Sequence, residues 1–154
     1  MKLSKQLSGI AGEYYVAAEL SRRGCLAAIT LRNSDGVDIL ASNESGEKTF
    51  SIQVKTTQNK RKWILGEKVE NDKADNKFYV FVNIQNDLNS LPEYFIVKAK
   101  DLANNIYEGH RYWLKEQGKN GRIRKDSSAR QFDPRYFSED ELLNWERLLS
   151  IFEE

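Results

Sequence analysis

The sequence is poor in the residues that form disulfides and zinc sites. A single cysteine, Cys25, excludes an intramolecular disulfide framework and is typical of a reducing compartment. One cysteine and one histidine, His110, cannot supply the four ligands of a finger-type zinc site. An internal disulfide and a zinc site of the finger type are therefore excluded.

The sequence also lacks a large excess of one charge and any long apolar run. The formal net charge is only +1, so any anion-binding surface must come from local clustering. No apolar run approaches membrane length, and the polar N-terminal residues do not resemble a signal peptide, so we expect a soluble cytoplasmic protein. The chain also lacks a phosphate-binding loop, a dinucleotide fingerprint and a nucleophile elbow.

The hydrophobic pattern predicts one domain that mixes helices and strands. The chain has 154 residues, of which 40% are hydrophobic and 31% charged, which suits a single domain with its own core. Helical spacing predicts helices over 4–23, 100–117 and 138–154. Alternating or continuous apolar runs predict strands over 26–31, 37–42, 48–57, 62–65, 78–85 and 93–99. This order indicates a single α/β or α+β domain over 1–154, with a core over about 4–100 and a helical C-terminal part over about 100–154.

Two of these helices have specific sequence signals. In the first, an apolar stripe at helical spacing is formed by Leu7, Ile10, Ala11 and Tyr14. In the last, Ser138 stands three residues before Glu141, as in a capping box at the start of a helix. The segment 118–134 between the second and third helices reads as a polar loop.

The hairpin around Ser45 and Gly46 gathers polar residues on one face. If these two residues form a two-residue turn, opposed residues have numbers that sum to 91, so that apolar residues pair on one face. On the other face Asp38 then lies opposite Gln53, with Lys55 one step along. A slip of one residue would break both features, which supports this register.

The first helix adds a carboxylate to this set. Glu13 shares a helix face with Val16, Ala17 and Leu20, a face otherwise built for packing. Carboxylate and amide oxygens of this kind suit Mg²⁺ or Mn²⁺, which keep several waters and bind substrate phosphate. An ammonium beside them would orient a water or stabilise the charge of a pentacovalent phosphate.

The segments "GEYYVAAEL", "GVDIL" and "IQVKTT" resemble the PD-(D/E)XK nuclease superfamily, which includes restriction endonucleases, Holliday-junction resolvases and Mrr-like enzymes. The resemblance covers roughly residues 12–57. It implies a restriction-endonuclease-like fold, an α/β mixed sheet of about five strands flanked by an N-terminal and a C-terminal helix. By the same resemblance Asp38, Gln53, Glu13 and the backbone carbonyl of Val54 bind Mg²⁺ or Mn²⁺, and Lys55 positions the attacking water.

Two positions depart from the pattern of that superfamily. Val37 takes the place of the proline that names the motif. Gln53 takes the place of the acid, which removes one negative charge and should lower metal affinity. A similar Gln-x-Lys occurs in Mrr-like branches, so the change does not by itself imply an inactive enzyme.

We therefore expect a Mg²⁺-dependent endonuclease acting on DNA, with RNA not excluded and a homodimer suggested by the resolvase-like relatives. The alternative is a nuclease-like module without catalysis that binds nucleic acid or a protein. A small immunity or accessory protein fits the size of the chain, but no residue indicates it. An ordinary cross-strand ion pair between Asp38 and Lys55 is the simplest competing interpretation, and it leaves Glu13 unexplained.

A basic strip follows the lysine strand. We expect it to contact nucleic acid, with backbone phosphates bound by its polar residues and a base or sugar stacked on its tryptophan. The strip comprises Thr57, Gln58, Lys60, Arg61, Lys62 and Trp63. A solvated loop is the alternative. A second basic cluster, around Lys119 and Arg122, is interpreted as a mobile surface loop in preference to a nucleic-acid contact.

Overall fold

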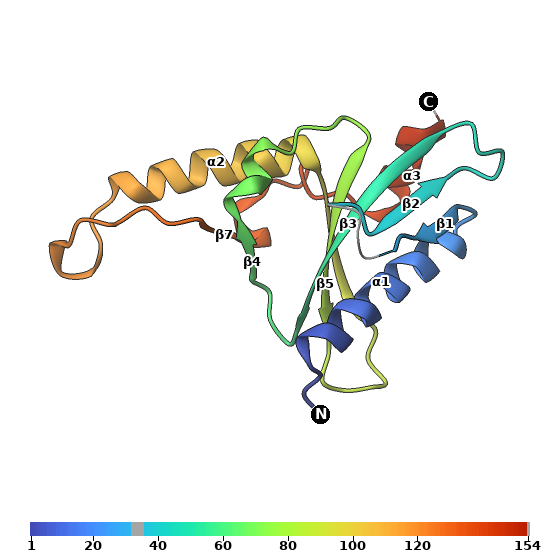
Figure 1. Ribbon diagram of the computed structural model, residues 1–154, viewed down its shortest axis with the longest axis horizontal. Helices are drawn as coiled ribbons and strands as arrows, with labels where there is room; N and C mark the ends of the chain where they lie inside the picture. Colours follow the sequence, from blue (N-terminus) through green and yellow to red (C-terminus); the bar gives the residue numbers. More distant parts are fainter. Residues whose placement is uncertain (32–35, 154) are drawn as a thin grey trace.

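The computed structural model describes residues 1–31 and 36–153 and contains a mixed five-stranded sheet with helices on both faces (Figure 1). The strand order is β1-β2-β3-β5-β6. The strands are β1 (Leu26–Ile29), β2 (Ile39–Ser42), β3 (Thr49–Gln58), β5 (Lys77–Ile84) and β6 (Glu93–Lys98). All neighbours pair antiparallel except β3 and β5, which are parallel. The α/β class, with its mixed sheet of five strands and its terminal helices, is as expected from the sequence.

Two short strands form a second sheet, of which the sequence predicted only the first strand, over 62–65. They are β4 (Trp63–Gly66) and β7 (Ala129–Phe132), which pair antiparallel. The residues of β7 fall in the segment 118–134 that was expected to be a loop. The C-terminal part of the chain is therefore less helical than predicted, because β7 returns to pair with a strand more than 60 residues earlier.

Helices and short 3₁₀ turns complete the fold. The helices are α1 (Lys5–Ser21), α2 (Ala99–Lys115) and α3 (Trp145–Glu153). The 3₁₀ turns are η1 (Glu67–Asn71), η2 (Lys119–Gly121) and η3 (Pro134–Tyr136). No helix among the described residues is long and apolar enough to span a membrane.

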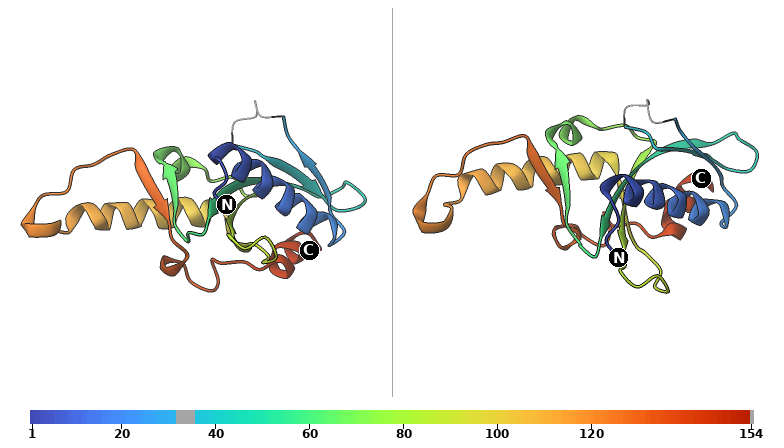
Figure 2. Two further views of the ribbon diagram at one scale, coloured as in Figure 1. Left: turned by 90° about the horizontal axis from the view of Figure 1, so that it is seen from below. Right: turned by 60° about the horizontal axis from the view of Figure 1, so that its bottom comes forward.

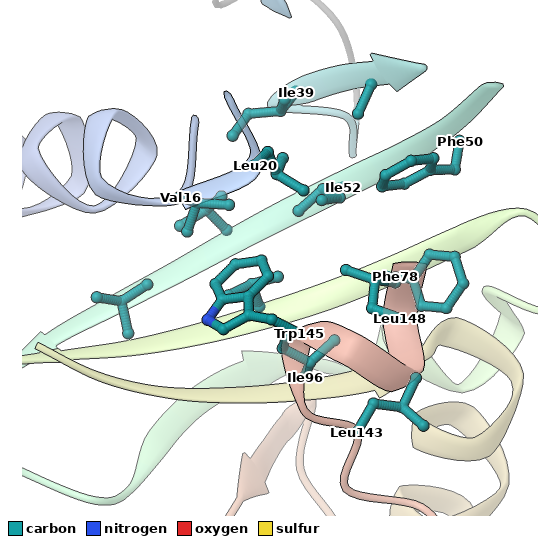
Figure 3. Close-up of a cluster of buried hydrophobic side chains, with 14 of the residues drawn as sticks. Val16, Leu20, Ile39, Phe50, Ile52, Phe78, Ile96, Leu143, Trp145 and Leu148 are labelled. Atoms are coloured by element: carbon teal, nitrogen blue, oxygen red, sulfur yellow. The ribbon is translucent and has the colours of Figure 1, made fainter. Parts of the chain in front are cut away.

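One hydrophobic cluster lies on the face of the sheet covered by α1 and α3 (Figure 3). Val16 and Leu20 of α1 pack there with Ile52 of β3 and Trp145 and Leu148 of α3. A second cluster lies on the other face, between the sheet, α2 and the β4–β7 sheet. Because β5 is buried on both faces, its sequence is an almost continuous apolar run.

The buried stripe of α1 differs from the one expected. Leu7 and Tyr14 are exposed, and the residues buried against the sheet are Ser8, Gly12 and Val16, followed by Leu20. Small side chains at the first two of these positions let the helix axis lie close to β3. Close approach of the backbones decides this packing, and hydrophobicity alone does not reveal it.

The β2–β3 register agrees with the sequence prediction, whereas the turn does not. Ile39 pairs with Ile52 and Ala41 with Phe50, so the numbers sum to 91 as expected. The turn is longer than two residues, since Asn43 N–H donates to the Lys48 carbonyl and Gly46 N–H to the Asn43 carbonyl. A symmetric lengthening of the loop leaves the pairing unchanged.

The last helix begins later than its capping box suggested. The Ser138 N–H donates to the Glu141 carboxylate at 2.8 Å, and the Glu141 N–H donates to the Ser138 hydroxyl at 3.3 Å. These capping hydrogen bonds close only a single turn. Leu143 then forms a bridge to Ile96 of β6, which requires extended backbone. The helix starts at Trp145, where the Asn144 side chain accepts from the backbone of Arg147 at 2.8 Å.

Candidate functional site

Asp38 lies where β2 separates from β3. Regular pairing ends at Ile39, and the Asp38 N–H donates to the Ile52 carbonyl at 2.9 Å. The Asp38 carboxylate accepts a hydrogen bond of 2.7 Å from the backbone N–H of Val54. The expected position of Asp38 directly across from Gln53 is therefore corrected. Beyond the end of β2, the Val54 N–H of β3 has no backbone acceptor on that side among the described residues, and the Asp38 carboxylate takes the place of one.

Gly12 brings α1 against β3 beside this point. A Cβ at Gly12 would lie 1.9 Å from the hydroxyl oxygen of Thr56, so only glycine permits this approach. By contrast, a Cβ at Gly9 would meet no atom within 4 Å. The contact at Gly12 sets the position of the next residue, Glu13.

Glu13 and Asp38 line one cleft. It has a volume of about 310 Å³ and lies between α1 and the chain entering β2, with Lys5 and Thr30 also in its wall. The Thr30 hydroxyl donates to the Val37 carbonyl at 2.6 Å, which supports the backbone just before Asp38. Both carboxyl residues are half-buried. The structure thus places two acids from separate elements around one small space.

Gln53 and Lys55 lie on the other face of β3. With its amide nitrogen facing the two acceptors, Gln53 donates to the Tyr79 hydroxyl and the Gly36 carbonyl, each at 3.3 Å. Its amide oxygen then accepts from the Lys55 ammonium at 3.1 Å. The four predicted side chains therefore form two pairs, Glu13 with Asp38 and Gln53 with Lys55. The Val54 peptide, bonded to Asp38, lies between them in the chain.

A buried polar cluster beside Gln53 was missed from the sequence. The Tyr79 hydroxyl donates to Asp72 at 2.6 Å, and the same carboxylate oxygen accepts from the Lys77 ammonium at 2.6 Å. Burial, and then the nearby Asp72, raises the pKa of Tyr79 far above its usual value, with a smaller contribution from Asp38. The phenol therefore stays protonated and serves as a neutral support for Gln53.

These partners of Gln53 are brought in by the parallel pairing of β3 with β5, in which Gln53 is level with Tyr79. The alternation along β5 places Lys77 and Tyr79 on one face, which is visible in the sequence. The neighbouring strand and its register are not visible there, because 18 residues separate the two strands.

The oxygen donors fit a hard divalent cation. Glu13 and Asp38 offer carboxylates, and no hydrogen bond from a described residue occupies the second oxygen of Asp38. Within the described residues no group of three or more His, Cys, Asp or Glu could hold a metal ion. A cation in this cleft would be held by the two carboxylates, whereas the amide oxygen of Gln53, on the other face of β3, accepts from Lys55. Mg²⁺ is often bound by one or two carboxylates together with water and phosphate.

Most of the predicted basic strip is engaged in contacts within the chain. The Thr57 hydroxyl donates to the Lys60 carbonyl at 2.7 Å, and the Gln58 amide bonds to the backbone of Met1 and Leu3 at 2.8 Å. Arg61 forms an ion pair with Glu93. Lys60 and Lys62 have exposed side chains and stay predicted phosphate contacts.

Trp63 does not fit the stacking role predicted for it. Its side chain is only 2% exposed, and its indole N–H donates to the Val82 carbonyl at 3.3 Å. The ring packs against Phe81, Phe95 and Phe132 in the second core cluster. Pairing of β4 with β7 turns this residue inward, so no ring face is available to a base.

No protein-family model matches this chain. No curated protein matches it either. Among solved structures, it is similar to Hjc, a Holliday junction resolvase from the archaeal hyperthermophile Archaeoglobus fulgidus. The identity is 14% and the TM-score 0.47, over 83% of this chain and 90% of that chain. At these values the similarity carries no functional argument.

Proposed function

We propose that this protein is a metal-dependent nuclease of the PD-(D/E)XK superfamily, in its Mrr-like or resolvase-like branch, with DNA as its substrate. The observation that supports this function is the cleft at the separation of β2 from β3. It is lined by the carboxyl residues Glu13 and Asp38, and Asp38 is bonded to the middle residue of the Gln-Val-Lys triplet.

The roles proposed for the site residues follow the resemblance to the superfamily. Asp38, Glu13, Gln53 and the carbonyl of Val54 would hold Mg²⁺ or Mn²⁺. Such an ion activates water and offsets charge on a reacting phosphate. The Lys55 ammonium would position a water or stabilise the charge of a phosphate. Its hydrogen bond of 3.1 Å to the Gln53 amide oxygen orients the ammonium. Lys60 and Lys62 would contact the phosphate backbone.

Cleavage assays test this proposal. The purified full chain is incubated with supercoiled, linear and branched DNA, and with RNA, in Mg²⁺ or Mn²⁺. We expect DNA cleavage that falls by about a hundredfold or more in Asp38→Ala and in Lys55→Ala, since each removes a group that acts on the transition state. Asp140→Ala and Lys100→Ala, at exposed positions, are the matched controls.

The proposal is wrong if the wild type cleaves none of these substrates, or if both site variants cleave as fast as the controls. The first result, combined with retained DNA binding, would favour the second candidate function.

That second candidate is a catalytically inactive nuclease-like module that binds nucleic acid or a protein partner. It is favoured by Gln53, whose amide oxygen faces the Lys55 ammonium where the superfamily has a carboxylate. The homodimer suggested by the sequence stays a prediction under both candidates.

A further inference from the structure

The chain from 111 to 125, here called the basic arm, projects from the body of the protein. It consists of the C-terminal end of α2 and the loop that follows (Figures 1 and 2). In all three views it lies at the end of the molecule away from α1 and β1.

Positive charge is concentrated in the basic arm. It carries six of the 24 Lys and Arg residues and one of the 23 Asp and Glu residues, a net charge of +5. The rest of the chain therefore carries −4. Such a division is hidden by the overall charge of +1, and it creates a local field that attracts polyanions.

The sequence suggested a mobile surface loop here, whereas the structure gives the arm contacts of its own. His110 of α2 contacts Asp126 of the returning chain at 2.7 Å. The Arg124 guanidinium donates to the Trp113 carbonyl at 2.8 Å and lies 4.8 Å from the centroid of the indole. The Gly118 N–H donates to the Arg122 carbonyl at 2.9 Å, closing the tip. These contacts tie the loop back onto the helix.

The cations of the arm form no ion pairs with acids in the part of the chain that the structure describes. Lys119, Arg122 and Lys125 are exposed, and none of the arm's six cations forms an ion pair with an acid in the described part of the chain. Outside the arm, by contrast, Arg130 pairs with Glu70 and Lys77 with Asp72. An ordered surface whose cations form no ion pair with an acid among the described residues is suited to an external polyanion.

We propose that the basic arm binds the sugar-phosphate backbone of a nucleic-acid duplex. Regularly spaced phosphates complement several cations carried on one ordered arm, and binding gains from the release of condensed counterions. Such contacts position a protein on a duplex without reading sequence. Base stacking is not part of the proposal, because Arg124 and His110 already contact the Trp113 ring.

The class of ligand, a nucleic acid, rests on the proposed function. The basic arm adds a second surface that would bind the substrate at a distance from the phosphate that reacts. Binding can be measured without divalent metal, so its test is independent of cleavage.

The test compares two triple variants of the full chain with equal loss of charge. The arm variant is Lys119→Gln/Arg122→Gln/Lys125→Gln, and the control is Lys68→Gln/Lys73→Gln/Lys100→Gln, at exposed positions outside the arm. Binding to labelled DNA and RNA duplexes of about 30 base pairs is followed by fluorescence anisotropy in EDTA over a range of salt concentrations.

For the arm variant we expect binding to DNA that is at least about tenfold weaker at about 100 mM salt. The slope of log affinity against log salt should fall by about 2.7, at about 0.9 for each phosphate that the protein no longer neutralises. The control should keep the wild-type slope. If the arm variant binds the RNA duplex equally more weakly, the arm contacts the backbone of either nucleic acid. If only binding to DNA is weakened, the arm contacts the backbone of DNA.

Equal weakening in both variants would overturn the proposal, because diffuse charge would then account for binding. Wild-type protein that binds neither duplex at low salt would overturn it as well, and an acidic protein partner would become the candidate. Absence of cleavage with arm-dependent binding would overturn the nuclease and leave the arm proposal standing.

Discussion

Gln53 connects Lys55 to the polar groups of Tyr79 and Gly36. Its amide nitrogen is within 3.3 Å of the Tyr79 hydroxyl and the Gly36 carbonyl, while its oxygen is 3.1 Å from the Lys55 ammonium. An amide satisfies all three partners, because it offers donors on one side and an acceptor on the other. A carboxylate would satisfy only some of them, so the loss of the acid at this position has a structural explanation.

We predict that Gln53→Glu is less stable than the wild type without metal and is stabilised by Mg²⁺. The new carboxylate faces the Gly36 carbonyl without a donor, which costs roughly 1–3 kcal/mol. A divalent cation would offset the added charge. Thermal unfolding in EDTA and in Mg²⁺ measures both effects, with Gln53→Met as a control that loses the same hydrogen bonds and adds no ligand. An equal response of the two variants to Mg²⁺ would argue against a metal near residue 53.

At the scale of elements, the packing of α1 on β3 positions Glu13. The helix buries a stripe that contains Ser8 and Gly12, and a Cβ at Gly12 would overlap the Thr56 hydroxyl. The Thr56 hydroxyl is itself buried without a hydrogen-bond partner among the described residues. The contact therefore depends on shape and not on a polar interaction.

We predict opposite effects of alanine at the two glycines of α1. Gly12→Ala forces the helix off the sheet and should destabilise the protein by roughly 1–3 kcal/mol. Gly9→Ala meets open space and should stabilise it by about 0.5–1 kcal/mol, since glycine is a poor helix former. Urea unfolding measures both changes. Thr56→Ala should recover part of the stability of Gly12→Ala, and similar behaviour of the two glycine variants would contradict the close contact.

At the scale of the whole molecule, the second sheet closes the core on the α2 side. β7 ends at Phe132, and the carboxylate of the next residue, Asp133, is buried and accepts from the backbone and guanidinium of Arg135. Phe132 and Phe137, on either side of this turn, pack against each other. Asp133 therefore stabilises the return of the C-terminal chain to the body.

We predict that Asp133 contributes to acid sensitivity. Hydrogen bonding to Arg135 holds the pKa of Asp133 below its usual value, against the opposing effect of burial. A carboxyl whose pKa is lower in the folded state stabilises the fold above its unfolded pKa and loses this contribution as pH falls through the folded value.

Asp133→Asn should thus lower stability by about 1 kcal/mol at neutral pH and flatten its decline in acid. Chemical unfolding between neutral pH and acid gives the comparison. Asp140→Asn, at an almost fully exposed carboxyl, is the control. A decline as steep as that of the wild type would exclude this role for Asp133.

The sequence alone was enough to predict the features that depend on local pattern. Alternation along 37–42 and 48–57 predicted the β2–β3 register, because one face had to be apolar and a slip would have exposed it. The same register singled out Asp38, Gln53 and Lys55, and helical spacing singled out Glu13. Their roles in metal binding and catalysis stay predictions.

Features that depend on distant pairing were set by the tertiary structure. Parallel pairing of β3 with β5 brought Tyr79 and Asp72 to Gln53, and pairing of β4 with β7 buried Trp63 in the second core. The bridge from Leu143 to Ile96 moved the start of α3 to Trp145. Local patterns record which face of a strand is buried, but which distant element covers that face depends on the packing of the whole chain.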